Sequence, residues 1–265
     1  MTERAAHVKV DGPGGDLNNQ VEAMHPNWLE EGNVTSQPLE CVEVNPGQGP
    51  VASILWLHGL GADGHDFEAI VPELRMPETM PIRYVFPHAP MRPVTLNGGM
   101  VMRAWFDILA AGFPRRVDMD GFLESVGHLE RMIEAEHRRG VPPERIVLAG
   151  FSQGGSIALH TGLRYEKPLA GILALSTYLP TLDSLSGELS RANAHIPIMM
   201  AHGFMDPMVP LENALTARDE LVRLGYPVEW SQYPMGHAVC PEEMDAIRSW
   251  LVRVLGERGS VRPWH

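Results

Sequence analysis

Short apolar runs alternate with amphipathic segments along most of this chain. Continuous apolar runs such as 52–57 and 146–149 are typical of strands that are buried on both faces. Segment 121–139 instead spaces its apolar residues three or four positions apart, as one face of a helix requires. We expect strands at 39–44, 52–57, 82–86, near 104–106, and at 146–149, 169–176, 196–201 and 228–232. We expect helices at 67–74, 121–139, 155–160, 211–224 and 241–255.

Strands and helices alternate with short connections between about residues 39 and 255. This order is typical of an α/β fold, in which helices cover both faces of a mostly parallel sheet. We expect one doubly wound catalytic domain over residues 35–258. The loop at 87–102 is long enough for a small flap, but no insertion is large enough for a cap domain.

The two ends of the chain depart from this pattern. Residues 1–34 show no apolar periodicity, and glycine, proline and aspartate cluster at 11–16. We interpret 1–34 as a flexible N-terminal extension and 259–265 as a polar tail. Met24 leaves open a second possible start of the chain.

The chain is acidic, with 21 basic and 33 acidic residues and a formal net charge of −12. This balance argues against partners such as nucleic acid or an anionic membrane surface. No apolar run approaches the ~18 residues of a membrane-spanning helix, and residues 1–20 lack the apolar core of a secretory signal peptide. With only two cysteines, we expect free thiols and a cytoplasmic protein.

The most informative motif lies at 150–154, which reads Gly-Phe-Ser-Gln-Gly and directly follows an apolar run. A serine with glycine two positions away on each side, between a strand and a helix, is the nucleophile-elbow pattern of α/β-hydrolases. The glycines leave room for a strained turn that exposes the serine at the end of the sheet. The motif therefore predicts an α/β-hydrolase fold with Ser152 as the nucleophile.

A serine nucleophile needs a histidine base and a carboxylate that orients the base. In this fold the acid and then the histidine follow the serine along the chain. His237 lies between the last predicted strand and the last predicted helix, and Asp206 is the only acid in the loop after the preceding strand. We therefore predict that Asp206 and His237 complete the triad. Four other downstream histidines are less suitably placed: His160, His195, His202 and His265.

A glycine-rich segment, 58–64, directly follows the predicted strand 52–57. Such a turn can bring a backbone N–H toward the serine, and we predict that Leu60 and Gln153 donate the two N–H groups of an oxyanion hole. A dinucleotide-binding loop is the rival interpretation, but its glycine pattern matches poorly here. We interpret His58 as a structural histidine that bonds within the loop.

The sequence contains no carboxylate and histidine cluster with metal-ligand spacing, and we expect neither a metal nor a cofactor. Cys240 lies three residues after His237, but we interpret it as a small residue at the start of the last helix. Six methionines near the predicted site either line an acyl pocket or belong to ordinary packing, and the sequence leaves both open. They are Met91, Met100, Met102, Met205, Met208 and Met235.

Several blocks together resemble the small carboxylesterase and acyl-protein thioesterase (phospholipase/carboxylesterase) family. These blocks are 58–64, 87–90, 96–99, 105–107, 150–155, 206–210 and 234–237. The resemblance covers roughly residues 50–255. It implies a triad of Ser152, Asp206 and His237, and an oxyanion hole shaped by Leu60 and Gln153. It also implies a lid-poor esterase that acts on short to medium acyl chains and can form a homodimer.

The sequence thus favours a serine carboxylesterase that cleaves small-molecule esters of short to medium acyl chains through an acyl-serine intermediate. An acyl-protein thioesterase or a lysophospholipase would use the same triad and is the alternative. A non-catalytic binding protein of the same fold is a remote third hypothesis, because the nucleophile, acid and base are all present. Dehalogenation would require aspartate at position 152.

Overall fold

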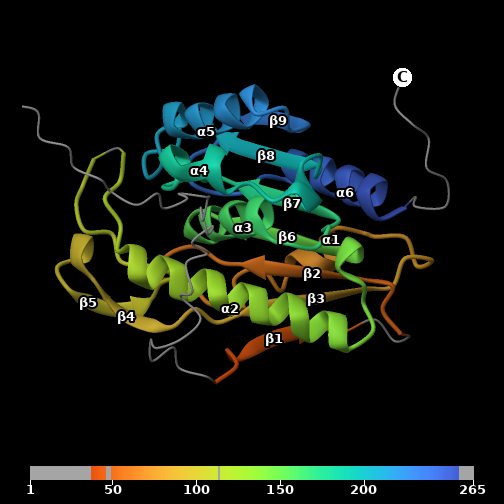
Figure 1. Ribbon diagram of the computed structural model, residues 1–265. Helices are drawn as coiled ribbons and strands as arrows, with labels where there is room; N and C mark the ends of the chain where they lie inside the picture. The colour runs from red at the N-terminus through yellow and green to blue at the C-terminus, as the bar shows by residue number, and fades with distance from the viewer. Residues whose placement is uncertain (1–36, 46–48, 113, 257–265) are drawn as a thin grey trace, which may run out of the picture. The chain divides into compact units, whose positions relative to one another are not determined.

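A mostly parallel sheet of seven strands lies at the centre of the described chain (Figure 1). The computed structural model describes residues 37–45, 49–112 and 114–256, so the predictions for 1–34 and 259–265 lie outside the described residues. The strand order is β1-β3-β2-β6-β7-β8-β9, and only β1 runs antiparallel to its neighbour. The strands are β1 (Cys41–Val44), β2 (Ala52–Leu57), β3 (Ile82–Pro87), β6 (Ile146–Phe151), β7 (Gly171–Leu175), β8 (Ile198–Gly203) and β9 (Val228–Tyr233).

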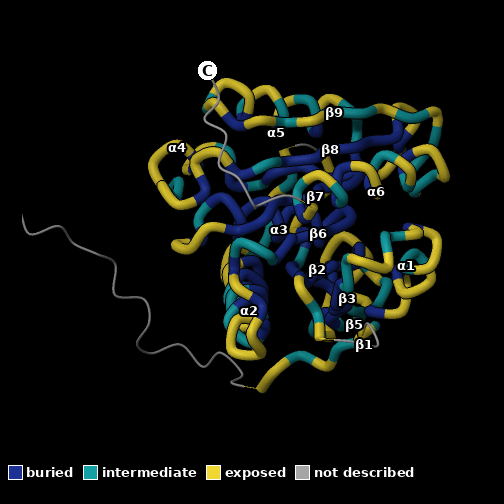
Figure 2. The backbone as a smooth tube through the Cα atoms, turned by 90° about the vertical axis from the view of Figure 1, so that its right-hand side faces the viewer, coloured by how far each residue is buried: buried dark blue, intermediate teal, exposed yellow. Residues whose placement is uncertain are grey.

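Helices cover both faces of this sheet. One apolar layer includes side chains of α2, α3, α4 and α5, and the other is completed by α1 and α6. Along β2, Leu55 and Leu57 belong to the first layer, whereas Ile54 and Trp56 belong to the second. Figure 2 shows the buried strands between the helices. The helices are α1 (Ile70–Glu73), α2 (Met119–Arg138), α3 (Gln153–Arg164), α4 (Leu182–Glu188), α5 (Leu211–Arg223) and α6 (Pro241–Gly256).

The predicted doubly wound α/β-hydrolase fold without a large cap is confirmed. Among the helices, α4 was not predicted, α1 is shorter than the predicted 67–74, and α3 is longer than the predicted 155–160. The predicted strand near 104–106 is wrong. Ala104, Trp105 and Phe106 are buried but irregular, so their apolar character reflects burial and not a place in the sheet.

The predicted loop at 87–102 instead contains a small antiparallel hairpin. Its strands are β4 (Met91–Val94) and β5 (Met100–Arg103). Gly98 and Gly99 connect them with φ values of 68° and 79°, a left-handed conformation that favours glycine. Met91 and Met100 are 59% and 63% exposed, so this element is a flap at the surface.

Within the described ranges, no helix is both long enough and apolar enough to cross a bilayer. The most exposed large apolar side chains belong instead to short surface elements such as the β4–β5 hairpin and the loop after β8. This finding agrees with the absence of a long apolar run in the sequence.

The first turn of α6 carries a carboxyl group inside the apolar core. Glu243 is fully buried, and this burial raises the pKa of its carboxyl to about 7, against an opposing contribution from the Cys240 backbone N–H. Between the ordinary pKa of 4.5 and about 7, the folded protein therefore binds a proton that the unfolded chain releases. The free energy of unfolding should fall as pH rises through this interval.

We expect Glu243→Gln to remove this loss of stability, because glutamine is neutral at every pH. Relative to the parent, the variant should gain in free energy of unfolding between pH 5 and pH 8, as measured by urea denaturation. The exposed neighbour Glu242 provides the matched control, and Glu242→Gln should show little pH-dependent difference. The prediction would be contradicted if the free energies of unfolding of Glu243→Gln and the parent differed by the same amount at pH 5 and at pH 8.

Candidate active site

Ser152 occupies the sharp turn between β6 and α3, as the motif predicts. Its φ and ψ are 54° and −118°, a strained conformation for a residue with a side chain. A Cβ on Gly150 would lie 2.3 Å from the Gly154 carbonyl, and one on Gly154 would lie 2.3 Å from the Leu57 carbonyl oxygen. Both flanking glycines are therefore required by close backbone contacts at the carboxyl ends of β2 and β6.

The structure brings Asp206 and His237 together at the ends of β8 and β9. His237 Nδ1 donates a hydrogen bond to Asp206 Oδ2 at 2.7 Å. The loops that carry them touch closely, because a Cβ on Gly203 would lie 2.3 Å from the carbonyl oxygens of Met235 and Gly236. This contact, and not nearness along the chain, pairs the predicted acid with the predicted base.

The remaining oxygen of Asp206 is also occupied. Asp206 Oδ1 accepts the backbone N–H groups of Met208 and Val209 at 2.8 and 2.9 Å. Burial alone would raise the pKa of this carboxyl, but the bond from His237 and the bonds from Val209 and Met208 hold it below its ordinary value. Asp206 is therefore an ionised acceptor that keeps the proton of His237 on Nδ1 and leaves Nε2 free to accept one.

Ser152 and His237 lie near each other without a direct bond. The rings of Phe151 and His237 are in contact, with their centroids 4.6 Å apart, so the base lies beside the residue that precedes the serine. Among the described residues, the Ser152 hydroxyl donates no hydrogen bond to a protein group. Catalytic hydrogen bonds of ligand-free enzymes often form only when substrate is bound.

The two predicted oxyanion donors belong to the loop after β2 and to the serine turn itself. A Cβ on Gly59 would lie 3.5 Å from the Ser152 Cβ, so the loop after β2 runs beside the serine. Within the described chain, neither the Leu60 nor the Gln153 backbone N–H donates to a protein acceptor. Two free donors beside a nucleophile are suited to an oxygen that gains negative charge.

Three other histidines at the sheet are neutral structural groups. His58 Nδ1 donates to the Gly59 carbonyl at 2.7 Å and its Nε2 accepts the Ala89 N–H at 3.0 Å, while burial lowers its pKa to about 4. Burial also lowers the pKa of His160, which bonds Thr181, and of His202, which donates to the Val209 carbonyl. His58 therefore bonds within its loop, as expected.

The methionines near the site are distributed over surface loops and not over the core. Met205 and Met208, in the loop after β8, are 57% and 53% exposed, as exposed as those of the β4–β5 hairpin. Met102 lies next to the loop after β2, because a Cβ on Gly61 would be 3.7 Å from its sulfur. Ordinary core packing therefore does not explain the exposed Met91, Met100, Met205 and Met208.

Several residues that bond the site together were not predicted. Thr177 Oγ1 donates to the Ser152 carbonyl at 2.6 Å, directly after Ser176, which has a strained φ of 46°. The Gln153 side chain bonds the backbone of Trp105 and Phe106. Nothing in a local sequence pattern marks these long-range bonds, although 105–107 is one of the blocks that carry the family resemblance.

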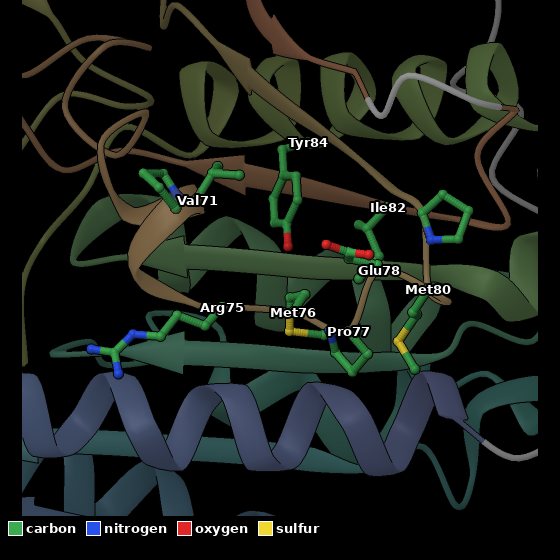
Figure 3. Close-up of a pocket in the computed structure, with 10 residues that line it drawn as sticks. Val71, Arg75, Met76, Pro77, Glu78, Met80, Ile82 and Tyr84 are labelled. Carbon is green, nitrogen blue, oxygen red and sulfur yellow. The ribbon is translucent and has the colours of Figure 1, made fainter.

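One further pocket lies away from the predicted triad. It is lined by residues of α1, the segment 75–81 and the start of β3, and the Tyr84 hydroxyl points into it (Figure 3). None of the five predicted site residues lines this pocket.

Over the described ranges, no three histidine, cysteine or acidic side chains are grouped so that they could hold a metal ion. Burial raises the pKa of the Cys240 thiol, which keeps it protonated.

Comparison with known proteins identifies the family of this chain. The Phospholipase/Carboxylesterase family matches residues 39–255. Acyl-protein thioesterase 1 of Neurospora crassa is 40% identical over 214 residues, which cover 77% of this chain and 87% of that protein.

Solved structures show the same similarity. The crystal structure of Arabidopsis thaliana SOBER1 has a TM-score of 0.73 at 35% identity, over 77% of this chain and 99% of that chain. Zea mays acyl-protein thioesterase 2 also has a TM-score of 0.73, at 29% identity, over 82% of this chain and 99% of that chain. Because the family match spans most of the sequence, this protein belongs to the Phospholipase/Carboxylesterase family of α/β-hydrolases.

Proposed function

We propose that this protein is a serine hydrolase that removes acyl groups through an acyl-Ser152 intermediate, with acyl thioesters as its preferred substrates. The observation that carries the proposal is the 2.7 Å bond between His237 and the buried Asp206, beside a serine held in a nucleophile elbow. These groups have the order and the roles of a catalytic triad.

In the proposed reaction, the Ser152 oxygen attacks the acyl carbonyl carbon while His237 Nε2 takes the hydroxyl proton. The carbonyl oxygen becomes an oxyanion, which accepts the backbone N–H groups of Leu60 and Gln153. His237 then gives its proton to the departing thiolate or alkoxide. A water molecule, deprotonated by the same ring, attacks the acyl-serine, and the carboxylic acid is released.

The choice of thioester over ester reverses the order favoured by the sequence alone. Carboxylesterase was the main hypothesis there, and acyl-protein thioesterase was its alternative. The names of the relatives support the alternative better, since a protein that is 40% identical is called acyl-protein thioesterase 1. The exposed methionines of the β4–β5 hairpin and the loop after β8 support an acyl substrate, because flexible apolar side chains accommodate alkyl groups.

A cytoplasmic location and an optional homodimer remain part of the proposal. Both described cysteines, Cys41 and Cys240, are free, which supports a reducing compartment. The acidic net charge of −12 supports small acylated substrates over nucleic acid as partners.

We expect Ser152→Ala and His237→Ala each to lower kcat by about three orders of magnitude or more, because each removes a member of the proposed triad. Both variants should keep the parent's circular-dichroism spectrum and nearly its Tm. Hydrolysis of a p-nitrophenyl ester measures kcat. Activity of Ser152→Ala within about tenfold of the parent would exclude it as the nucleophile.

We expect Asp206→Asn to lower kcat by about 10³- to 10⁴-fold, with little change in KM. An asparagine would still accept the Met208 and Val209 N–H groups, but it could present an amide N–H to His237 and favour the wrong tautomer. The control is Asp219→Asn on the exposed face of α5, which should leave kcat unchanged. Equal rates for Asp206→Asn and the parent would remove this carboxylate from the mechanism.

Two peptides of one sequence, one S-palmitoylated on cysteine and one O-palmitoylated on serine, separate the thioester and ester hypotheses. We expect a kcat/KM at least about tenfold higher for the thioester. The reverse order would restore the carboxylesterase hypothesis. A lysophospholipid and a series of p-nitrophenyl esters complete the comparison, and the absence of a large cap predicts no jump in rate when an ester exceeds its solubility.

A further inference from the structure

The two backbone N–H groups beside Ser152 come from segments that are far apart in the sequence. Leu60 belongs to the loop after β2, whereas Gln153 is the first residue of α3. An oxyanion is stabilised only if both donors lie at about 2.7–3.1 Å from its position. Their relative placement therefore has to be maintained by bonds outside the two peptide groups themselves.

A single buried segment, Trp105–Phe106, bonds to both of these regions. Gln153 Oε1 accepts the Trp105 backbone N–H at 3.0 Å, and Gln153 Nε2 donates to the Phe106 carbonyl at 2.9 Å. The Trp105 indole N–H donates to the His58 carbonyl at 2.9 Å, two residues before Leu60. Gln153, Trp105 and Phe106 are all at least 98% buried, so water does not compete for these bonds.

The Trp105–Phe106 segment is itself held in place. The Ser125 hydroxyl of α2 donates to the Trp105 carbonyl, and the Ala104 N–H donates to the Pro90 carbonyl at 3.1 Å. The Gly61 N–H donates to the Arg103 carbonyl at 2.9 Å, which ties the position after Leu60 to the same stretch of chain. The segment is thus bonded to α2, and Ala104, directly before it, is bonded to Pro90.

The orientation of the Gln153 carboxamide is determined by its partners. The Trp105 N–H needs an acceptor and the Phe106 carbonyl needs a donor, so only one arrangement satisfies both. Each bond spans 47 or 48 residues, and the Trp105 indole bond spans 47. Such long-range bonds restrict the distance between α3 and the loop after β2 more than any local contact could.

We propose that the Gln153 side chain is a positioning residue of the proposed reaction, and that it acts with Trp105 as a brace between the two oxyanion donors. The inference rests on the proposed function, since it concerns the same serine site. Gln153 would then contribute twice, with its backbone N–H as a donor and with its carboxamide as the group that aims that donor. The brace should matter most when the oxyanion forms, and little when substrate binds.

The test compares the parent with Gln153→Met, which keeps the backbone N–H and a similar side-chain volume but loses both carboxamide bonds. We expect kcat for p-nitrophenyl octanoate to fall by about 10- to 100-fold, while KM changes by less than about threefold. Octylboronic acid forms a tetrahedral adduct with an active-site serine, so its inhibition constant should rise by about the factor by which kcat/KM falls.

Trp105→Phe is the second variant, because it removes only the indole bond to the His58 carbonyl. We expect a loss of kcat of about three- to tenfold in the same direction. In the double variant with Gln153→Met, Trp105→Phe should cause a smaller further loss of kcat than it causes alone, since both changes disrupt one brace.

Asn193 provides a matched control at a distance from the serine. Its buried carboxamide also bonds backbone groups, accepting from Leu169 at 2.9 Å and donating to Tyr165 at 2.8 Å. We expect Asn193→Leu to lower Tm while kcat and the boronate inhibition constant stay within about twofold of the parent.

A folded Gln153→Met protein with kcat within about threefold of the parent would overturn the brace, as would an equal loss of kcat in Asn193→Leu. If Gln153→Met does not fold, an unchanged kcat and boronate affinity in Trp105→Phe would overturn it instead. Ser152→Ala separates the two proposals. If Ser152→Ala is inactive and Gln153→Met is fully active, only the brace is refuted. If Ser152→Ala is active, the proposed function itself is refuted.

Discussion

The close backbone contact between β2 and the start of α3 is the constraint on which the candidate site depends. Gly154 lies so near the Leu57 carbonyl oxygen that any side chain would displace one segment from the other. The contact places the loop after β2 against the serine turn, where the Leu60 and Gln153 backbone N–H groups have no protein acceptor among the described residues. Unpaired donors cost stability wherever water is scarce, and the proposed oxyanion hole would give these two a partner.

Two of the three non-glycine residues with positive φ in the described chain lie at the same place. Ser152 and Ser176 both have positive φ, and they follow the neighbouring strands β6 and β7. The Ser152 N–H donates to the Leu175 carbonyl at 2.9 Å, and Thr177 donates to the Ser152 carbonyl. The two strained turns therefore stabilise each other through bonds between adjacent strand ends. Strain of this kind persists only where the surrounding structure compensates for it, which the packed sheet does here.

The fold and the residues of the proposed triad could be read from the sequence because both depend on regular features. Strands that are buried on both faces read as apolar runs, and parallel strands bring the loops after β6, β8 and β9 to one edge of the sheet. The elbow glycines indicate Ser152 as the proposed nucleophile, and the placement of Asp206 and His237 after strands indicates its proposed partners. The His237–Asp206 bond shows that this placement is sufficient for contact.

The errors have specific physical causes. Pro93 and the exposed methionines concealed the β4–β5 hairpin, although Asn97-Gly98 is a hairpin turn signal. Trp105 and Phe106 were predicted as a strand because burial and strand formation both select apolar residues. Their bonds to the Gln153 side chain join residues almost fifty positions apart. No local pattern can report such bonds, which depend on the finished packing of α2, α3 and the loop after β2.

Burial distinguishes the proposed base, His237, from three other histidines. His58, His160 and His202 are each less than about a tenth exposed, and burial lowers the pKa of all three, so they remain neutral. His237 differs in its exposure. Its side chain is 20% exposed and its Nδ1 donates to the ionised Asp206, whereas His202, whose Nε2 lies 3.5 Å from the same carboxylate, is fully buried. A base must gain and lose a proton in each cycle, which requires both access and a compensating charge. Of these four rings, only His237 has both.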